Sequence, residues 1–240
     1  MRRLTASLAA CLLLAACSDS SDHRQEAPTP VDPPPPPVEP TDLDSTGVYR
    51  GQLVTGNRNL ALVTVTLARD GTTAIAIDSD DDEKANIVFW GETSEAAGEL
   101  DFSGRDGRDG SAINLTFTAS EQTLRGQWQL AGLSGELSAD LAPESAVDDG
   151  LSGGQFARLD SPGGLTALEL AGDGTLTLTA PCEGSGEIST PDPAVNVHYL
   201  SLASDCLDWE ALVSVDTVAG AKAALRVTGA GGLATRLYQP

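Results

Sequence analysis

Few side chains in this 240-residue chain could carry acid–base or nucleophilic chemistry. There are two histidines, and His23 stands in a proline-rich stretch. A serine- or cysteine-based catalytic site would therefore have to use His198, and no Gly-x-Ser-x-Gly motif is present. His198 falls on the face of its run opposite Val197 and Tyr199, so we expect a solvent-exposed strand histidine. No zinc spacing, phosphate-binding loop or dinucleotide fingerprint occurs, so the sequence predicts neither an enzyme nor a cofactor.

One acidic stretch contains enough carboxylates to suggest a Ca²⁺ site. Its members are Asp78, Asp80, Asp81, Asp82 and Glu83. The spacing is not that of an EF-hand, because counting from Asp78 puts Glu83 at the glycine position and Phe89 at the bidentate position. We interpret the stretch as a solvated hairpin loop that discourages edge pairing. Asp78, Asp80 and Asp82 remain weak candidates for a metal site.

The amino terminus combines features of an export signal. Arg2 and Arg3 precede an apolar run over residues 4–16 that ends in small side chains and is too short to span a bilayer. Its end, Leu-Ala-Ala-Cys17, resembles the lipobox of bacterial lipoproteins. That resemblance implies cleavage before Cys17, diacylglycerol on its sulfur and acylation of the new amine, palmitate being a usual acyl group. A second Leu-Ala-Ala-Cys ends at Cys11, but too few apolar residues precede it.

The resemblance also implies a location and a partner. Ser18 after the cysteine favours sorting to the outer membrane of a Gram-negative bacterium. The protein would contact the membrane through its lipid, and two or more acyl chains make such anchoring stable. An ordinary secretory signal ending near Ala16 is the alternative.

The remaining cysteines form an even pair. With Cys11 in the signal peptide and Cys17 lipidated, Cys182 and Cys206 are left. In an oxidising compartment such a pair predicts a disulfide. A redox or metal pair is the alternative, but neither a Cys-x-x-Cys spacing nor a second ligand set accompanies the two cysteines.

The strongly acidic composition limits the possible partners. The formal net charge is −21, and removal of Arg2 and Arg3 with the signal makes it −23. Nucleic acid and anionic head groups are poor partners for such a surface. A cationic protein, a metal ion or a high-salt medium fits such a surface better, and a merely solvated surface is the simplest interpretation. Other envelope proteins are further candidate partners.

Two kinds of sequence follow the signal. Residues 17–46 form the lipid anchor and a linker with an unbroken run from Pro33 to Pro37, which has nothing to bury and favours extended polyproline II. From residue 47 onward, short alternating apolar runs are separated by turn residues such as Asp70-Gly71, a pattern typical of antiparallel sheet. Eight such strands precede residue 143, and no helical period lies between them.

The second half repeats the first. At an offset of 103 residues, Gly51-Gln52-Leu53 matches Gly154-Gln155-Phe156, and residues 65–72 match 168–175 without a gap. Further on, Gly98-Glu99-Leu100 resembles Gly186-Glu187-Ile188. The expected strands of the second copy are 155–159, 165–171, 175–180, 184–189, 195–203, 207–215, 221–228 and 233–238.

The sequence therefore predicts an all-β protein with two tandem antiparallel meander domains. We expect a signal peptide over 1–16, the anchor and linker over 17–46, domains over 47–142 and 152–240, and a linker over 143–151. Each domain could be an eight-stranded barrel or a flattened sandwich. One membrane-spanning barrel of sixteen strands is disfavoured by the scarce aromatics and by acidic residues on both faces. Trp90, Trp128 and Trp209 could line a cleft, but we expect them in the cores.

These features favour a lipid-anchored envelope protein with a non-enzymatic binding or assembly role. A lipocalin-like carrier is the alternative, because small inward side chains would leave a cavity for an apolar ligand. A hydrolase is a weaker hypothesis, because no pair of acids on a shared strand end is recognisable.

Overall fold

The computed structural model describes most of the chain from residue 42 onward. The described residues are 42–55, 60–78, 87–120, 122–130, 133–145, 151, 153–160, 164–206, 208–216 and 224–239. All of them belong to one compact unit, Val38–Pro240. Among these residues no helix is long and apolar enough to cross a bilayer.

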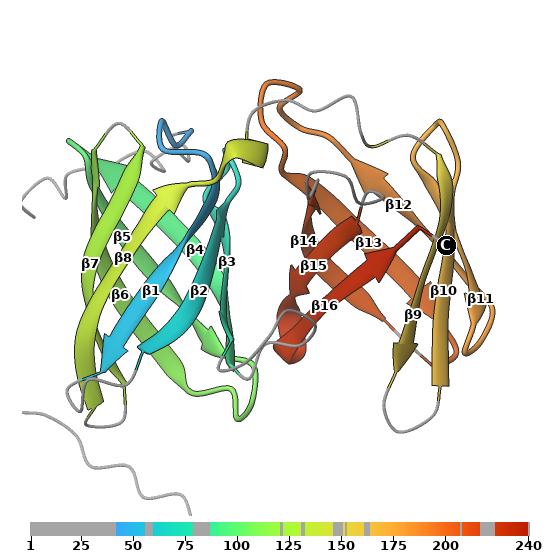
Figure 1. The fold of residues 1–240 in the computed structure, drawn as a ribbon, viewed down its shortest axis with the longest axis horizontal. Coiled ribbons are helices and arrows are strands. Elements are labelled where there is room, and N and C mark those ends of the chain that lie inside the picture. Colours follow the sequence, from blue (N-terminus) through green and yellow to red (C-terminus); the bar gives the residue numbers. More distant parts are fainter. Residues whose placement is uncertain are drawn as a thin grey trace, which may run out of the picture. The chain divides into compact units, whose positions relative to one another are not determined.

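The described part of the chain forms two closed eight-stranded antiparallel barrels in tandem, each with its strands in sequential order (Figure 1). The first barrel comprises β1 (Gly47–Thr55), β2 (Leu60–Leu67), β3 (Thr72–Asp78), β4 (Ile87–Ala96), β5 (Glu99–Asp106), β6 (Ala112–Ser120), β7 (Thr123–Leu130) and β8 (Leu133–Leu141). The second comprises β9 (Gly154–Asp160), β10 (Gly164–Leu170), β11 (Thr175–Ala180), β12 (Gly184–Ser189), β13 (His198–Ser204), β14 (Trp209–Asp216), β15 (Ala224–Gly229) and β16 (Leu233–Tyr238). The prediction of two all-β meander domains is confirmed, and the choice between barrel and sandwich is settled in favour of barrels.

The two barrels close differently. In the first barrel, β1 pairs with β8 over seven positions, from Tyr49 with Leu141 to Thr55 with Gly135. In the second, the structure pairs β16 with β9 at a single position, Tyr238 with Ala157. The second barrel is therefore joined by far fewer backbone contacts at its closing strands.

Contiguous apolar side chains fill both interiors. Successive side chains of a strand point to opposite faces, and on β6 Ile113, Leu115 and Phe117 are buried while the even-numbered residues are exposed. In the first barrel Phe102 and Phe117 are fully buried, and in the second Phe156 is. Leucines and valines contributed by the other strands surround these rings.

The internal repeat is visible in the turns between the second and third strands of each barrel. Gly71 and Gly174 both have positive φ, 94° and 88°, which glycine adopts without steric cost. Their amides donate to Ala68 O and Ala171 O at 3.0 and 3.1 Å. The carbonyl of Gly71 accepts from Thr93 N of the fourth strand, and that of Gly174 accepts from Ile188 N.

One part of the sequence alignment is wrong. The sequence match pairs Ile188 with Leu100 on β5. In the structure the counterpart of Ile188 is Thr93 on β4, because both donate to the glycine carbonyl of the equivalent turn. The short motif Gly-Glu-apolar occurs at both places because exposed and buried positions alternate in any such strand.

Cys182 and Cys206 form the predicted disulfide, linking the segment after β11 to the segment after β13. The bridge closes a loop with a sequence separation of 24 residues. A loop of this length restricts the unfolded chain by about 3 to 4 kcal/mol in the entropic model.

The segment that leaves the first barrel packs against it. Pro143–Ser145 forms a short 3₁₀ helix, η1, and Ser145 is buried. The Ser145 hydroxyl accepts a hydrogen bond from Val48 N at 3.0 Å. The first part of the predicted linker is thus ordered, and residues 146–150 lie outside the described residues.

Candidate functional site

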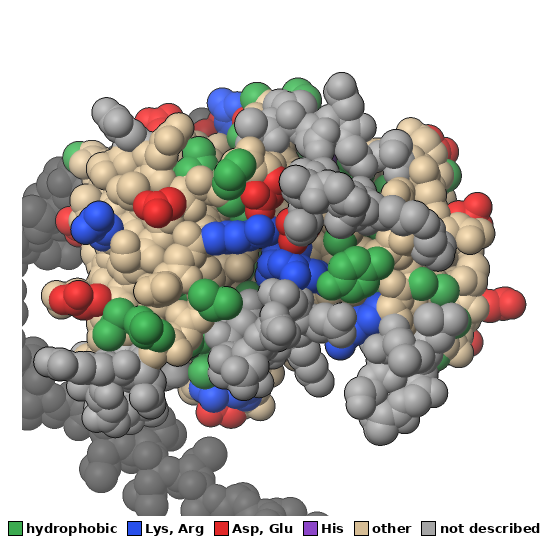
Figure 2. All heavy atoms as spheres, in the orientation of Figure 1, with side chains coloured by type: hydrophobic (Ala, Val, Ile, Leu, Met, Phe, Trp, Pro, Cys, Tyr) green, Lys and Arg blue, Asp and Glu red, His purple; other side chains and the backbone are tan. Residues whose placement is uncertain are grey.

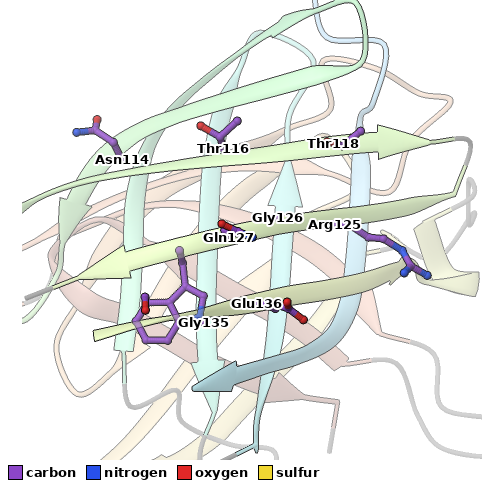
Figure 3. A pocket seen from close by; sticks show the side chains of 10 residues that line it. Asn114, Thr116, Thr118, Arg125, Gly126, Gln127, Gly135 and Glu136 are labelled. Carbon is purple, nitrogen blue, oxygen red and sulfur yellow. The ribbon is translucent and has the colours of Figure 1, made fainter. Parts of the chain in front are cut away.

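One hollow of about 700 Å³ lies on the outer face of β6, β7 and β8. Its exposed lining is polar: Asn114, Thr116 and Thr118 from β6, Arg125 and Gln127 from β7, and Ser134 and Glu136 from β8. Figure 3 shows the labelled side chains spread over three neighbouring strands instead of converging on one point. Such a surface can form hydrogen bonds but does not assemble a catalytic centre.

A second recess, which we call the junction groove, is built by both barrels. It consists of two hollows of about 530 and 250 Å³ that share Thr72 and Trp90. The larger is lined by β3, β4, β5 and the first residue of β6, and the smaller runs from Trp90 to the outer face of β12, β13 and β14. Trp90 is partly buried and stands where the two hollows meet.

Strand register arranges the charged residues of the junction groove in rows. On the second barrel, Ser201 pairs with Glu187 on one side and with Glu210 on the other, so the two carboxylates flank the serine. On the first barrel, Trp90 pairs with Arg105 in the next strand. Glu92, two residues beyond Trp90, lies on the same face and also lines the groove.

Both groove carboxylates on the second barrel are exposed. A carboxyl group that serves as a general acid near neutral pH is usually desolvated by its surroundings. Among the described residues, two carboxylates are buried, those of Asp106 and Asp216. Each forms ion pairs with arginine side chains. The groove is therefore better suited to binding than to acid–base catalysis.

His198 is buried, so the expectation of a solvent-exposed histidine is wrong. Its side chain is 5% exposed and lies on the inward face of β13 with Leu200 and Leu202. Thr190 Oγ1 lies 2.8 Å from Nδ1, and Asn196 Oδ1 lies 3.2 Å from Nε2. Since the amide oxygen can only accept, Nε2 carries the proton and Nδ1 accepts from the threonine hydroxyl.

Asn196 connects this histidine to the segment between the barrels. Its Nδ2 donates to Glu144 O and to Val215 O, both at 2.7 Å, and its Oδ1 accepts from Val215 N at 2.9 Å. Its own amide donates to Ser145 O at 3.2 Å. The His198 and Asn196 side chains are thus structural, because their polar atoms are used within the fold.

Burial lowers the pKa of His198 to about 4. Because the unfolded side chain titrates near 6.5, the unfolded chain binds a proton between pH 6.5 and 4 that the folded chain does not. We expect the free energy of unfolding to be unaffected by this group above pH 6.5 and to fall by on the order of 2 to 3 kcal/mol as the pH drops to 4.

Urea unfolding of the wild type and of His198→Gln at several pH values in this range checks the prediction. The comparison uses the slope of unfolding free energy against pH, so a constant loss of stability in the variant does not matter. A slope in the variant as steep as that of the wild type would contradict it.

Apolar side chains from the outer faces of the two barrels meet in one buried cluster. Its members are Val48, Ala68, Ala74 and Ala142 from the first half and Val197 and Leu212 from the second. Trp90 and Tyr199 pack against it. The Tyr199 hydroxyl donates to Asp70 Oδ1, and burial together with this carboxylate raises the pKa of Tyr199.

An ion-pair network lies beside this cluster. Asp216, at the end of β14, has a side chain only 4% exposed. Its Oδ2 lies 2.9 Å from Arg236 Nη2, 3.3 Å from Arg50 Nη2 and 3.7 Å from Arg226 Nη2. Arg50 belongs to the first barrel and also pairs with Glu144 of η1. Basic side chains gather beside acidic ones near the centre of the view in Figure 2.

The other predicted site residues have mixed outcomes. Cys17, Asp80 and Asp82 lie outside the described residues, as does the side chain of Asp78 at the end of β3. Within the described part of the chain, no group of three or more metal-ligating side chains occurs. Trp128 and Trp209 are buried as expected, whereas Trp90 lines the junction groove.

Sequence reasoning missed the residues that join the barrels. Arg50 and Asp216 look like solvated strand charges. A signal was nevertheless present: β14 contains Ala-Leu-Val-Ser-Val, and β3 alternates Ala74 and Ala76 with Ile75 and Ile77. Strands that are apolar on both faces are buried on both faces.

Comparisons of the chain with protein-family models, with curated proteins and with solved structures find no significant match.

Proposed function

We propose that this protein is a lipid-anchored protein of the bacterial outer membrane whose two-barrel unit binds other envelope components without catalysing a reaction. The lipobox ending at Cys17 supports the anchoring. The binding role rests on one observation: apolar side chains fill both barrel interiors, and the described hollows lie on outer faces. A partner would therefore contact the outside of the barrels, including the junction groove.

The filled interiors also favour this role over that of a lipocalin-like carrier. A barrel that encloses a ligand leaves its interior partly empty. Here Phe102 and Phe117 occupy the first interior and Phe156 the second, each at most 1% exposed. Native mass spectrometry of the purified protein should therefore find no apolar molecule retained besides the covalent lipid. A stoichiometric bound lipid would favour the carrier.

Labelling with radioactive palmitate in a Gram-negative host tests the anchoring. Wild type should incorporate label and sediment with outer membranes, whereas Cys17→Ser should lose the label because the acylated sulfur is absent. Cys11→Ser is the matched control, since it changes the other Leu-Ala-Ala-Cys sequence, and its labelling should equal that of wild type. Label that persists in Cys17→Ser, or is absent from wild type, would contradict the proposal.

Crosslinking in intact envelopes tests the binding role. The wild-type protein should crosslink to particular envelope proteins in a stable pattern, and mass spectrometry identifies both proteins and lipids. An absence of crosslinks beyond those given by any abundant envelope protein would argue against a binding role while leaving the lipid anchor intact.

A further inference from the structure

The junction groove combines an aromatic surface with an excess of negative charge. Trp90 lines both of its hollows, and Tyr199 lines the smaller one. Three carboxylates line it, those of Glu92, Glu187 and Glu210. Among the described residues that line it, one is basic, Arg105, whose Nη1 donates to Gly110 O at 3.0 Å in the next turn.

On the second barrel, the carboxylates of Glu187 and Glu210 lie on either side of Ser201. Adjacent strands lie about 4.8 Å apart, so Glu187 and Glu210, one strand to either side of Ser201, stand about 10 Å apart at the backbone. Glutamate side chains are long enough to approach a cation over Ser201 from both sides. The neighbouring row contains Ser189, which adds a hydroxyl group to the same wall, and Tyr199, whose hydroxyl is hydrogen-bonded to Asp70 and whose ring lines the wall.

An aromatic ring beside carboxylates is suited to cationic side chains. Lysine and arginine are attracted to the face of tryptophan by its quadrupole, while the carboxylates supply charge-assisted hydrogen bonds. The protein as a whole carries a net charge of −21, which raises the association rate of a basic partner and disfavours an acidic one. Because the groove is open and continues across strands of both barrels, it suits an extended chain better than an enclosed small molecule.

We propose that the junction groove binds an extended segment of a partner protein that carries lysine or arginine side chains, with one cation over Trp90 and another between Glu187 and Glu210. This inference deepens the proposed binding function and rests on it for its biological setting. The smaller hollow of the groove has walls from both barrels, and the buried cluster and the ion-pair network join the barrels and so fix the spacing of those walls.

The test measures the Kd of a fluorescent peptide of alternating lysine and serine for the full processed protein in detergent. Glu187→Gln with Glu210→Gln should weaken binding by about tenfold or more, in line with the loss of close charge contacts at an interface. Glu99→Gln with Glu169→Gln is the matched control, because both residues are exposed strand glutamates that line none of the described hollows. This control removes the same net charge and should change Kd by less than about twofold.

Two further measurements separate specific binding from general attraction. Acetylation of the lysines should abolish binding, and Trp90→Leu should weaken it about threefold or more through loss of the cation–aromatic contact. The proposal would be overturned if the groove double variant and the control double variant weakened peptide binding equally. It would also be overturned if the acetylated peptide bound as tightly as the unmodified one. Near-ultraviolet circular dichroism verifies that each variant is folded. If Trp90→Leu does not fold, the double variant Glu187→Gln with Glu210→Gln still decides the test, because both residues are exposed.

The outcome is independent of lipidation, because the assay does not depend on the acyl chains. Failure of peptide binding with normal palmitate labelling and specific envelope crosslinks would overturn only the groove assignment. Loss of labelling in the wild type would instead overturn the anchoring and leave the groove measurement valid.

Discussion

Replacing Asp216 by asparagine is expected to lower the free energy of unfolding by about 3 kcal/mol or more. The reason is the environment of the carboxylate, which is almost wholly buried and has guanidinium groups of Arg236, Arg50 and Arg226 within 3.7 Å. Removing one member of a buried ion pair typically costs 3 to 5 kcal/mol because charge stays buried without its compensating partner. Asparagine keeps the volume, so the loss reports on charge.

Urea or thermal unfolding measures this effect, and Asp101→Asn is the control. Asp101 is also a strand aspartate, on β5, but it is exposed, and asparagine can still accept the hydrogen bond from Thr116, so its replacement should change stability by less than about 0.5 kcal/mol. Adding Arg50→Met to each background gives a double-mutant cycle for the contact between the barrels. A loss for Asp216→Asn as small as that of the control would show that the network does not stabilise the fold.

Replacing Gly135 by alanine should cost about 3 kcal/mol or more, concentrated in the first barrel. A Cβ atom at this position would lie 1.8 Å from Val54 O of the neighbouring strand and 2.6 Å from Trp128 Nε1. The first of these neighbours is backbone, which cannot rotate away. Overpacking of side chains typically costs 1 to 3 kcal/mol, and here β1 and β8, the strands that close the barrel, must separate.

The matched control for Gly135 is Gly172→Ala. Gly172 lies in a turn of the second barrel where an added Cβ would meet no atom within 4 Å, and its φ is not positive. This change should be neutral or slightly stabilising, because alanine restricts the unfolded chain. Thermal unfolding of the three proteins compares them, and a melting temperature for Gly135→Ala equal to that of Gly172→Ala would refute the steric argument.

Much of the fold could be predicted because the strands obey local rules. Period-two alternation and the Asp-Gly turns at Asp70 and Asp173 located the strands, and the repeated turn identified a duplication. Whether eight strands close into a barrel or flatten into a sandwich depends on strand coiling. Glycines such as Gly135 allow the close backbone approach that curved sheets use, and alternation does not encode it.

The phase of β13 shows why the candidate site was harder to predict. An interpretation of Val197 and Tyr199 as inward-facing predicts that His198 faces outward. In the structure β13 begins at His198, and Val197 and Tyr199 instead contact the apolar cluster between the barrels. Around the start of this strand both faces contact apolar side chains, so apolar character does not distinguish inside from outside there, and an error of one position reverses every side chain.

The junction groove is even harder to predict from the sequence. Its walls come from strands that are far apart in the chain, for example β4 with Trp90 and β14 with Glu210. No spacing rule connects such residues, because their proximity depends on how two barrels dock. The docking depends on charged groups such as Arg50 and Asp216, which a sequence pattern assigns to solvent.

The difference in closure makes the two barrels unequal in their tolerance of change. In the first barrel, loss of one backbone pair between β1 and β8 leaves six others. In the second, the described residues pair β16 with β9 at one position, Tyr238 with Ala157, and the Arg158 side chain of β9 also donates a hydrogen bond to Thr235 of β16. A substitution that prevented the backbone pair from forming, such as proline at Ala157, would leave the joint to side-chain contacts. Selection should therefore act more stringently on the backbone at Ala157 than at any single position along the corresponding joint of the first barrel.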